Sequence, residues 1–486
     1  MPTVSAVRSG RAAAAVTAAG ALVYGWQVGR PGVWMDEAAT IDVCRRTPAQ
    51  VFALARHEDL VHLAYYLVAK LAWAVHPSIV SVRSVGVAAM AATAGLLVLI
   101  GARLRSLPVG VVAGLLLVVN PLASRFAQEA RSAALVTVLA TLLTWQLLGL
   151  LERTDGGRRW AGYSATLVLL GLANVLGLLM VLPHALAAGA AGRLRAWTAA
   201  AAAGLVVLAP FVLAAHGQRG QVYWIPAPHL YDLHAFARDF LGGQAAIVLV
   251  GLLVVVAALV RSRVGWTAPV RRALRLGLGW ALLPPAVLWT VSFVTPLYQD
   301  RYVLYVLPGI ALALAALVVR LATALAELPW ARWLVPAVAL ALVAVVGAPA
   351  QAQARRMADG HTENLAAVAD YLARSARPGD EMVAVPMEVR MLRQAYPQLA
   401  GLADPTVAVE PLAGATLEGK DVPPGQVPAA LAPHPRIWLV RESYQADDLL
   451  TGSERAALAA LAASYRPGSR RVFADIEVTL MVRRGG

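Results

Sequence analysis

Long apolar runs separated by short polar stretches dominate the first 350 residues. A membrane-spanning helix needs about 20 mainly apolar residues. Nine runs approach that length: 12–29, 84–102, 107–121, 133–151, 198–215, 244–260, 276–294, 303–319 and 333–350. A tenth stretch, 160–192, is too long for one span and predicts two short ones that turn near Asn174. The pattern therefore predicts an all-α membrane bundle of about eleven transmembrane helices.

Composition agrees with this interpretation. Hydrophobic residues make up 59% of the 486 residues and charged residues only 14%, against roughly 25% charged in an ordinary soluble protein. Cys44 is the single cysteine, which excludes an internal disulfide and a cysteine-based zinc site. The net charge of +14 does not indicate a nucleic-acid partner, because the arginines lie mostly between apolar runs. Arginine greatly outnumbers lysine, which is typical of a GC-rich bacterial genome.

The distribution of arginine predicts the orientation. Arg8 and Arg11 precede the first span, and alternate loops after it carry arginine clusters, which places the N-terminus in the cytoplasm. The opposite loops carry most of the acidic residues and histidines of this region: 30–83, 120–132, 216–243 and 295–302. Chemistry is therefore expected on the outer face of a bacterial plasma membrane, and eleven spans would place the C-terminal segment on that same side.

The chain changes character near residue 351. Segment 351–486 is polar, with strand-like runs at 381–385, 436–440 and 471–483. A helix over 363–376 begins after Thr362, and Thr451 with Glu454 has the spacing of a capping box. We expect two domains, 1–350 in the membrane and 351–486 as an extracytoplasmic soluble α/β domain, the latter without a recognisable catalytic constellation.

Two adjacent carboxylates, Asp36 and Glu37, follow the first span. A charge inside the bilayer costs at least roughly 3 kcal/mol, so two acidic residues next to a span indicate a structural or functional role. Asp36 has two compatible interpretations. It caps a short helix over 37–46, or it is a catalytic group held at the start of that helix.

The same loop continues with a dense polar segment, 56–62. Tyr65 and Tyr66 then open an apolar segment, 63–75, and this order predicts an interfacial helix at the membrane surface. Asp59 and His62 are three residues apart, so on a helix they would share one face. An oxygen and an imidazole ligand suit a divalent metal ion, whereas the alternative is a solvated polar loop without a metal.

Further polar residues lie in the other outer segments. Arg83 opens the second span, Glu129 and Arg131 precede the fourth, and Arg301 and Tyr302 precede the tenth. Arg125 is expected to be a membrane anchor only. Arg131 and Arg301 each stand near a carboxylate at the start of a span, which favours a functional role for them. Arginine suits phosphate binding because its guanidinium donates paired hydrogen bonds.

Taken in order, these motifs resemble the membrane-embedded GT-C glycosyltransferases, in the bacterial branch related to protein O-mannosyltransferases and the lipid A aminoarabinose transferase. The resemblance covers roughly residues 10–320. It implies an inverting transfer of a sugar, with mannose the first expectation, from a polyprenyl-phosphate donor to a hydroxyl of a glycan, glycolipid or protein. It assigns Asp36 as the catalytic base and Glu37 as its orienter. It implies substrate-binding roles for Tyr65, Tyr66, Arg83, Glu129, Arg131, Arg301 and Tyr302, and a metal role for Asp59 and His62.

Two other classes of function remain open. A transporter or flippase for lipid-linked sugars would show ionisable residues or broken helices at the membrane midplane, often in two matched repeats. The chain has no clear internal repeat, and Pro284-Pro285 is its best candidate for a broken helix. A non-catalytic scaffold would leave the polar density of loop 30–83 unexplained.

Overall fold

The computed structural model describes residues 4–152, 157–222, 224–260, 266–325, 327–358, 360–361, 363–443 and 449–485. The chain separates into two compact units, each built from two segments. Unit 1 comprises Met1–Val28 and Val82–Ala352, and unit 2 comprises Gly29–Ser81 and Gln353–Gly486. The first outer loop therefore belongs to the same compact unit as the C-terminal segment, although the two are far apart in sequence.

The regular secondary structure in the described residues of unit 1 is entirely helical. Its α-helices are α1 (Val4–Gly25), α5 (Ile79–Arg103, whose first turn belongs to unit 2), α6 (Leu107–Val119), α7 (Pro121–Ala127), α8 (Ala133–Leu151), α9 (Gly157–Ala173), α10 (Val181–Ala190), α11 (Leu194–Gly217), α12 (Leu230–Leu241), α13 (Gln244–Leu259), α14 (Ala268–Val291), α15 (Leu307–Ala324) and α16 (Ala331–Gln353). Three 3₁₀ helices join them: η2 (Val175–Met180), η3 (Arg219–Val222) and η4 (Asp300–Val306).

Six helices of the described chain are long and apolar enough to cross a membrane: α5, α8, α11, α14, α16 and the continuous η4–α15 segment. The count rises to eight if the bent pairs α6–α7, with an angle of 67°, and α12–α13, with an angle of 84°, each form one span. These elements match predicted runs and indicate a multi-pass membrane protein. The expected break at Asn174 is confirmed, since its side chain caps η2 between α9 and α10. The total of eleven spans stays a prediction.

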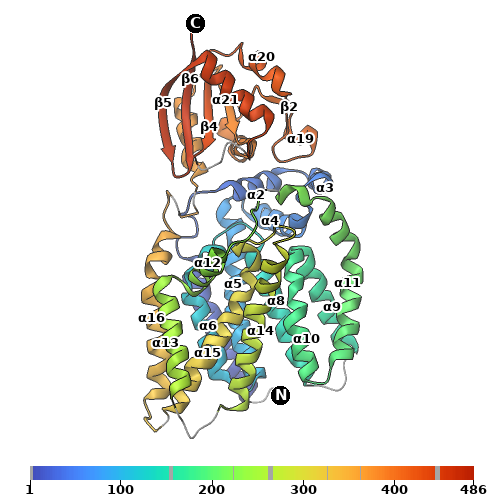
Figure 1. Cartoon of the computed structure of the whole chain (residues 1–486), viewed down its shortest axis with the longest axis vertical. Coiled ribbons are helices and arrows are strands. Elements are labelled where there is room, and N and C mark those ends of the chain that lie inside the picture. The colour runs from blue at the N-terminus through green and yellow to red at the C-terminus, as the bar shows by residue number, and fades with distance from the viewer. Residues whose placement is uncertain are drawn as a thin grey trace. The chain divides into compact units, whose positions relative to one another are not determined.

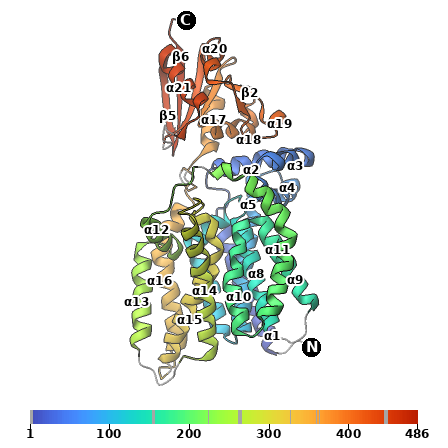
Figure 2. The ribbon, with the colours of Figure 1, turned by 45° about the vertical axis from the view of Figure 1, so that its right-hand side comes forward.

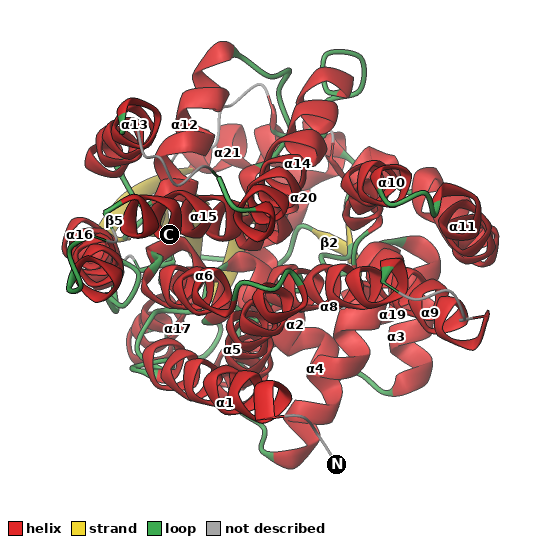
Figure 3. Ribbon diagram, turned by 90° about the horizontal axis from the view of Figure 1, so that it is seen from below, coloured by secondary structure: helices red, strands yellow, loops and turns green. Residues whose placement is uncertain are grey.

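Helix α15 packs against both α14 and α6 inside unit 1 (Figure 3). Helices α5 and α6 meet at glycines: a β-carbon on Gly110 would lie 2.9 Å from the α-carbon of Gly101 and 2.7 Å from the carbonyl oxygen of Val98. Small residues at such crossings let two backbones approach each other, which is a common device for packing helices in membranes.

A buried polar chain connects α8, α9, α10 and α11. The indole N–H of Trp197 donates to the Tyr163 hydroxyl at 2.9 Å, and that hydroxyl lies 2.9 Å from Nδ1 of His184. Nε2 of His184 lies 3.0 Å from Oγ1 of Thr144, whose hydroxyl donates to the carbonyl of Ala140. Because the Trp197 N–H and the Ala140 carbonyl fix both ends, Tyr163 donates to Nδ1 and a neutral His184 donates from Nε2.

Unit 2 combines short helices of the first outer loop with an α/β segment. The loop contains α2 (Met35–Arg45), α3 (Pro48–His57), η1 (Leu60–His62) and α4 (Leu63–Val75). The C-terminal part contains α17 (Leu365–Ser375), β1 (Glu381–Val385), η5 (Met387–Arg390), α18 (Met391–Ala395), η6 (Pro397–Leu399), β2 (Val407–Val409), α19 (Pro411–Gly414), β3 (Lys420–Asp421), η7 (Pro424–Gln426), α20 (Val427–Leu431), β4 (Arg436–Glu442), α21 (Gly452–Ser464), β5 (Tyr465–Phe473) and β6 (Ile476–Arg483).

The main sheet of unit 2 has the strand order β1-β4-β6-β5 (Figures 1 and 2). Strands β1 and β4 are parallel, and the other neighbours are antiparallel. Alternate side chains face opposite sides, as the pleat requires. Ile437 packs into a core with Leu461 of α21, whereas Trp438 contacts Tyr371 of α17. The sheet is thus covered on both faces.

The predicted C-terminal elements are mostly confirmed. Strand β1 coincides with 381–385, and Thr451 and Glu454 form the expected capping box of α21. One strand over 471–483 is wrong: the chain turns at Ala474, which has a φ of 52°, so the segment contains the end of β5 and all of β6. Asn364 caps α17, whereas Thr362 lies outside the described residues.

Candidate active site

Asp36 and Glu37 lie in the first turn of α2. The helix begins one residue before Asp36, and Trp34 occupies the N-cap position without a side-chain cap hydrogen bond. The expectation that Asp36 caps this helix is therefore wrong, and so is the predicted start at residue 37. The positive end of a helix stabilises nearby carboxylates, so the first turn is a favourable place for two acidic side chains.

Glu37 is completely buried and contacts a histidine from the C-terminal segment. Its Oε2 atom lies 3.6 Å from Nδ1 of His361, and both side chains have no exposed surface. The backbone N–H of Met35 donates to the carboxyl group of Glu363 at 2.7 Å. Sequence reasoning missed His361 and Glu363, although both belong to a polar cluster that directly follows the last apolar run.

The carboxyl group of Glu363 lies in an acidic environment. Burial raises the pKa of Glu363 to about 8, and the negative charges of Glu442, Asp36 and Asp475 act in the same direction. The hydrogen bond from Met35 opposes this shift. Glu363 is therefore mostly protonated at neutral pH, although an isolated glutamate would be ionised.

The C-terminal end of α2 is also held by the C-terminal segment. Arg46, directly after the helix, forms a buried ion pair with Asp42 at 2.7 Å and donates to the carbonyl of Thr416 at 2.6 Å. Arg45 donates to the carbonyl of Gln394 at 2.8 Å. Helix α2 thus contacts the α/β segment at both of its ends.

The candidate metal residues lie near each other in the first outer loop. Nε2 of His62 is 3.8 Å from a carboxylate oxygen of Asp59, and the hydroxyl of Tyr66 donates to the other oxygen of that carboxylate. Asp59 precedes the helical segment in a left-handed conformation. No group of three or more histidine, cysteine, aspartate or glutamate side chains that could hold a metal occurs among the described residues. Two ligands alone do not match the coordination of a typical protein-bound metal ion.

The two predicted groove tyrosines occupy neighbouring positions on α4. Tyr65 and Tyr66 each have about 1% of their surface exposed. The pairing of Tyr66 with Asp59 accounts for the burial of the Tyr66 hydroxyl. The first outer loop therefore carries Asp36, Glu37 and the two tyrosines on short helices of one compact unit.

The remaining predicted site residues belong to unit 1. Arg83 is fully buried on α5 and donates to the carbonyl of Val28 at 2.9 Å. Glu129 lies in the bend between α7 and α8, as does Arg131. Glu129 accepts a hydrogen bond from Arg125 at 3.2 Å, so Arg125 is not only a membrane anchor as expected.

Arg301 lies in η4 and Tyr302 follows it. The guanidinium of Arg301 lies 5.5 Å from the ring centres of both Trp224 and Tyr302, a distance that permits cation–π attraction. The neighbouring Asp300 accepts a hydrogen bond from the Tyr298 hydroxyl at 3.0 Å.

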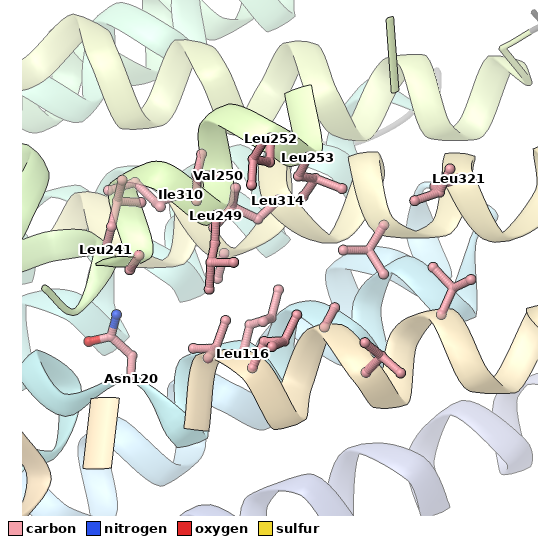
Figure 4. Close-up of a pocket in the computed structure, with 18 of the residues that line it drawn as sticks. Leu116, Asn120, Leu241, Leu249, Val250, Leu252, Leu253, Ile310, Leu314 and Leu321 are labelled. Carbon is pink, nitrogen blue, oxygen red and sulfur yellow. The ribbon is translucent and has the colours of Figure 1, made fainter. Parts of the chain in front are cut away.

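Unit 1 also contains an apolar cavity of about 460 Å³ (Figure 4). Its walls come from α6, α12, α13, α15 and α16. Apart from the amide of Asn120 and the indole of Trp330, the lining side chains are hydrocarbon, including Leu116, Leu253 and Leu314. Such a surface suits a hydrocarbon chain.

Comparison with known proteins identifies solved structures that have a similar fold. No family model matches the chain, and no curated protein matches its sequence. Among solved structures, ArnT from Cupriavidus metallidurans in the apo state superimposes with a TM-score of 0.57 and 14% identity, over 96% of this chain and 97% of ArnT. ArnT bound to undecaprenyl phosphate gives a TM-score of 0.57 and 13% identity over the same shares of the two chains.

A weaker likeness is to the Archaeoglobus fulgidus oligosaccharyltransferase tethered with an acceptor peptide. That comparison has a TM-score of 0.47 and 13% identity, over 94% of this chain and 72% of the other. The ArnT comparison extends over nearly the whole length of both chains, C-terminal α/β segment included. This chain therefore has the GT-C fold of the lipid A aminoarabinose transferase ArnT.

Proposed function

We propose that this protein is a glycosyltransferase that moves a sugar from a polyprenyl-phosphate donor to an acceptor hydroxyl. The observation that carries the proposal is the end-to-end likeness to ArnT, which has been solved with undecaprenyl phosphate bound. Fold alone does not define a reaction. The proposal therefore also rests on the carboxylates of α2 and on the apolar cavity of unit 1.

The cavity supports a polyprenyl donor. Its nearly continuous hydrocarbon lining accommodates part of an isoprenoid tail. The sugar-phosphate end of such a donor needs cationic partners. Arg83, Arg131 and Arg301 are the proposed phosphate-binding residues, and Tyr302 adjoins Arg301.

The reaction needs one base and a stabilised leaving group. Asp36 accepts the proton of the acceptor hydroxyl as its oxygen attacks the anomeric carbon. The bond between that carbon and the phosphate oxygen breaks, and polyprenyl phosphate leaves with its charge stabilised by arginine. Direct attack with a single carboxylate base inverts the anomeric configuration. Glu37 orients Asp36, while Tyr65, Tyr66 and Glu129 shape the sugar and acceptor site.

The proposed cellular setting follows from the arginine distribution. The site and the C-terminal segment face outward from a bacterial plasma membrane, and the acceptor is a glycan, a glycolipid or a protein of the cell envelope. Mannose is the sugar to test first. Asp59 and His62 are the residues to test for a divalent metal ion, and no step of the proposed reaction requires that ion.

The decisive experiment uses Asp36→Asn. The purified protein in lipid nanodiscs is incubated with radiolabelled polyprenyl-phosphate sugars and with envelope extracts as the acceptor source, with and without chelator. Loss of a catalytic base predicts a fall in transfer of roughly 10²–10⁴-fold. Asp370→Asn is the matched control, because Asp370 is an exposed carboxylate on α17. Transfer by Asp36→Asn at the rate of the control would remove Asp36 from the mechanism.

The same preparation distinguishes the competing transporter or flippase. In proteoliposomes, a glycosyltransferase moves label from the lipid to another molecule, whereas a flippase moves the intact labelled lipid between leaflets. Movement of intact donor without any transferred label would overturn the proposed function.

A further inference from the structure

The start of α2 is attached to a short segment that directly follows the last membrane helix. We call this segment the strap and define it by Met357, Gly360, His361, Glu363, Asn364 and Leu365. The N–H of Gly32 donates to the carbonyl of Met357 at 3.2 Å, and the N–H of Leu365 donates to the carbonyl of Val33 at 2.9 Å. With the Met35–Glu363 bond, three hydrogen bonds to the strap hold three of the four residues 32–35.

The strap and the chain before α2 approach very closely at Gly32. A β-carbon on Gly32 would lie 2.8 Å from the side-chain oxygen of Asn364 and 3.0 Å from its α-carbon. Asn364 is itself fixed, because its oxygen caps α17 and its amide donates to the carbonyl of Met357 at 3.0 Å. The strap is therefore a defined surface against which α2 begins.

Two side chains of the strap reach the residues on either side of Asp36. Glu363 accepts the N–H of Met35, which is one of the four backbone donors left without a partner inside a helix at its start. His361 lies 3.6 Å from Glu37 in a fully buried pair. Asp36 stands between these two attachments, so its position depends on both.

Position 363 carries an acid, although a neutral side chain could also accept the N–H of Met35. A serine or an amide side chain would satisfy the Met35 N–H without introducing another acid beside Asp36 and Glu37. Glu363 lies instead among Glu442, Asp36 and Asp475, which disfavours its ionised form. Groups whose pKa values are shifted by burial and by neighbouring charges are concentrated at functional sites.

On the basis of the proposed function, we propose that Glu363 and His361 are positioning residues: acting from the C-terminal segment, they set the location of the Asp36 carboxylate for attack by the acceptor. They act through Met35 and Glu37 and do not touch the substrate. The α/β segment thereby takes part in catalysis, although its own sequence shows no catalytic constellation.

The test uses the full-length protein in nanodiscs with Glu363→Ala, Glu363→Gln and His361→Gln. Loss of positioning predicts that Glu363→Ala lowers kcat roughly 10–100-fold while KM for the donor stays within about twofold. Glu363→Gln keeps an acceptor oxygen for the Met35 N–H and restores most of kcat. His361→Gln also lowers kcat, because Glu37 loses its partner next to the base.

A second His–Glu pair of the same unit provides the control. His434 lies 3.5 Å from Glu381 of β1, and within the described part of the chain neither residue forms a hydrogen bond to residues 32–37, so His434→Gln and Glu381→Gln should leave kcat unchanged. Hydrogen exchange of peptides covering residues 33–45 provides a readout independent of activity. Exchange there should be faster in Glu363→Ala than in Glu363→Gln or the controls.

The outcomes separate the two proposals. If Asp36→Asn is inactive but Glu363→Ala retains full kcat and unchanged exchange, the positioning role is wrong and the proposed function stands. If Asp36→Asn is fully active, the assigned base is wrong. Faster exchange in Glu363→Ala would then still support the attachment of α2 to the strap, while its catalytic purpose would be refuted.

Discussion

Replacing His184 by leucine tests the buried polar chain that connects four helices of unit 1. The change removes the acceptor of the Tyr163 hydroxyl and the donor to Thr144. The Thr144 hydroxyl still donates to the carbonyl of Ala140. Most of the lost stability therefore comes from the Tyr163 hydroxyl, because its proton no longer has an acceptor. A buried polar group left without its partner costs about 1–3 kcal/mol. We expect His184→Leu to lower the free energy of unfolding by that amount.

A double-mutant cycle with Tyr163→Phe sharpens this test. The Tyr163→Phe variant leaves both the Trp197 N–H and Nδ1 of His184 without partners, whereas the double variant leaves only the Trp197 N–H. The double variant should therefore be more stable than the sum of the two single changes indicates, by about 1–2 kcal/mol. Ser164→Ala is the control, because the Ser164 hydroxyl donates to the carbonyl of Ala200 at 2.7 Å and takes no part in the buried polar chain. Interhelical hydrogen bonds in membranes average about 0.6 kcal/mol, so this variant should lose about that much stability.

The assay is reversible unfolding in mixed detergent micelles, followed by tryptophan fluorescence. The reasoning depends on the direction of each hydrogen bond, since only a neutral His184 with its proton on Nε2 gives this pattern. Strict additivity of the two single variants, or a His184→Leu variant as stable as the parent, would refute it.

Two further predictions concern pH and helix packing. Glu363 binds its proton more tightly in the folded protein, so its contribution to stability is complete below the ordinary glutamate pKa of about 4.5 and is lost as pH rises through about 8. Thermal unfolding at pH 5, 7 and 9 should show a smaller alkaline loss for Glu363→Gln than for the parent; equal slopes would contradict this. Gly110→Ala should destabilise the α5–α6 crossing by about 1–3 kcal/mol, whereas Gly251→Ala, which meets nothing within 4 Å, should not. A Gly110→Ala variant as stable as Gly251→Ala would show that the two helices can separate without loss.

Hydropathy predicted where the long helices lie, because a membrane imposes one dominant constraint on each span. It did not predict that two candidate spans bend by 67° and 84°, since bending depends on packing against neighbours. Local turn chemistry was readable where a motif is specific, as at Thr451 and Glu454. It failed at Ala474, where a residue without turn preference adopts a positive φ.

The candidate site was only partly readable from sequence. Adjacent carboxylates after an apolar run are an unusual local pattern, so Asp36 and Glu37 could be singled out. Their partners His361 and Glu363 could not, because hydrogen bonds between residues 328 positions apart leave no periodicity in the sequence. The pairing of Glu129 with Arg125, four residues away, was within reach of helical spacing.

The attachment of α2 to the strap has a consequence for biosynthesis. Met35 is synthesised 328 residues before Glu363, a delay of roughly 15–65 s at common bacterial translation rates of about 5–20 residues per second. During that interval, the helix that bears Asp36 has no strap to fold against. The proposed transferase activity should therefore reach its full rate only once translation has passed the last membrane helix, and incomplete chains left in the membrane should consume donor lipid more slowly than the complete protein.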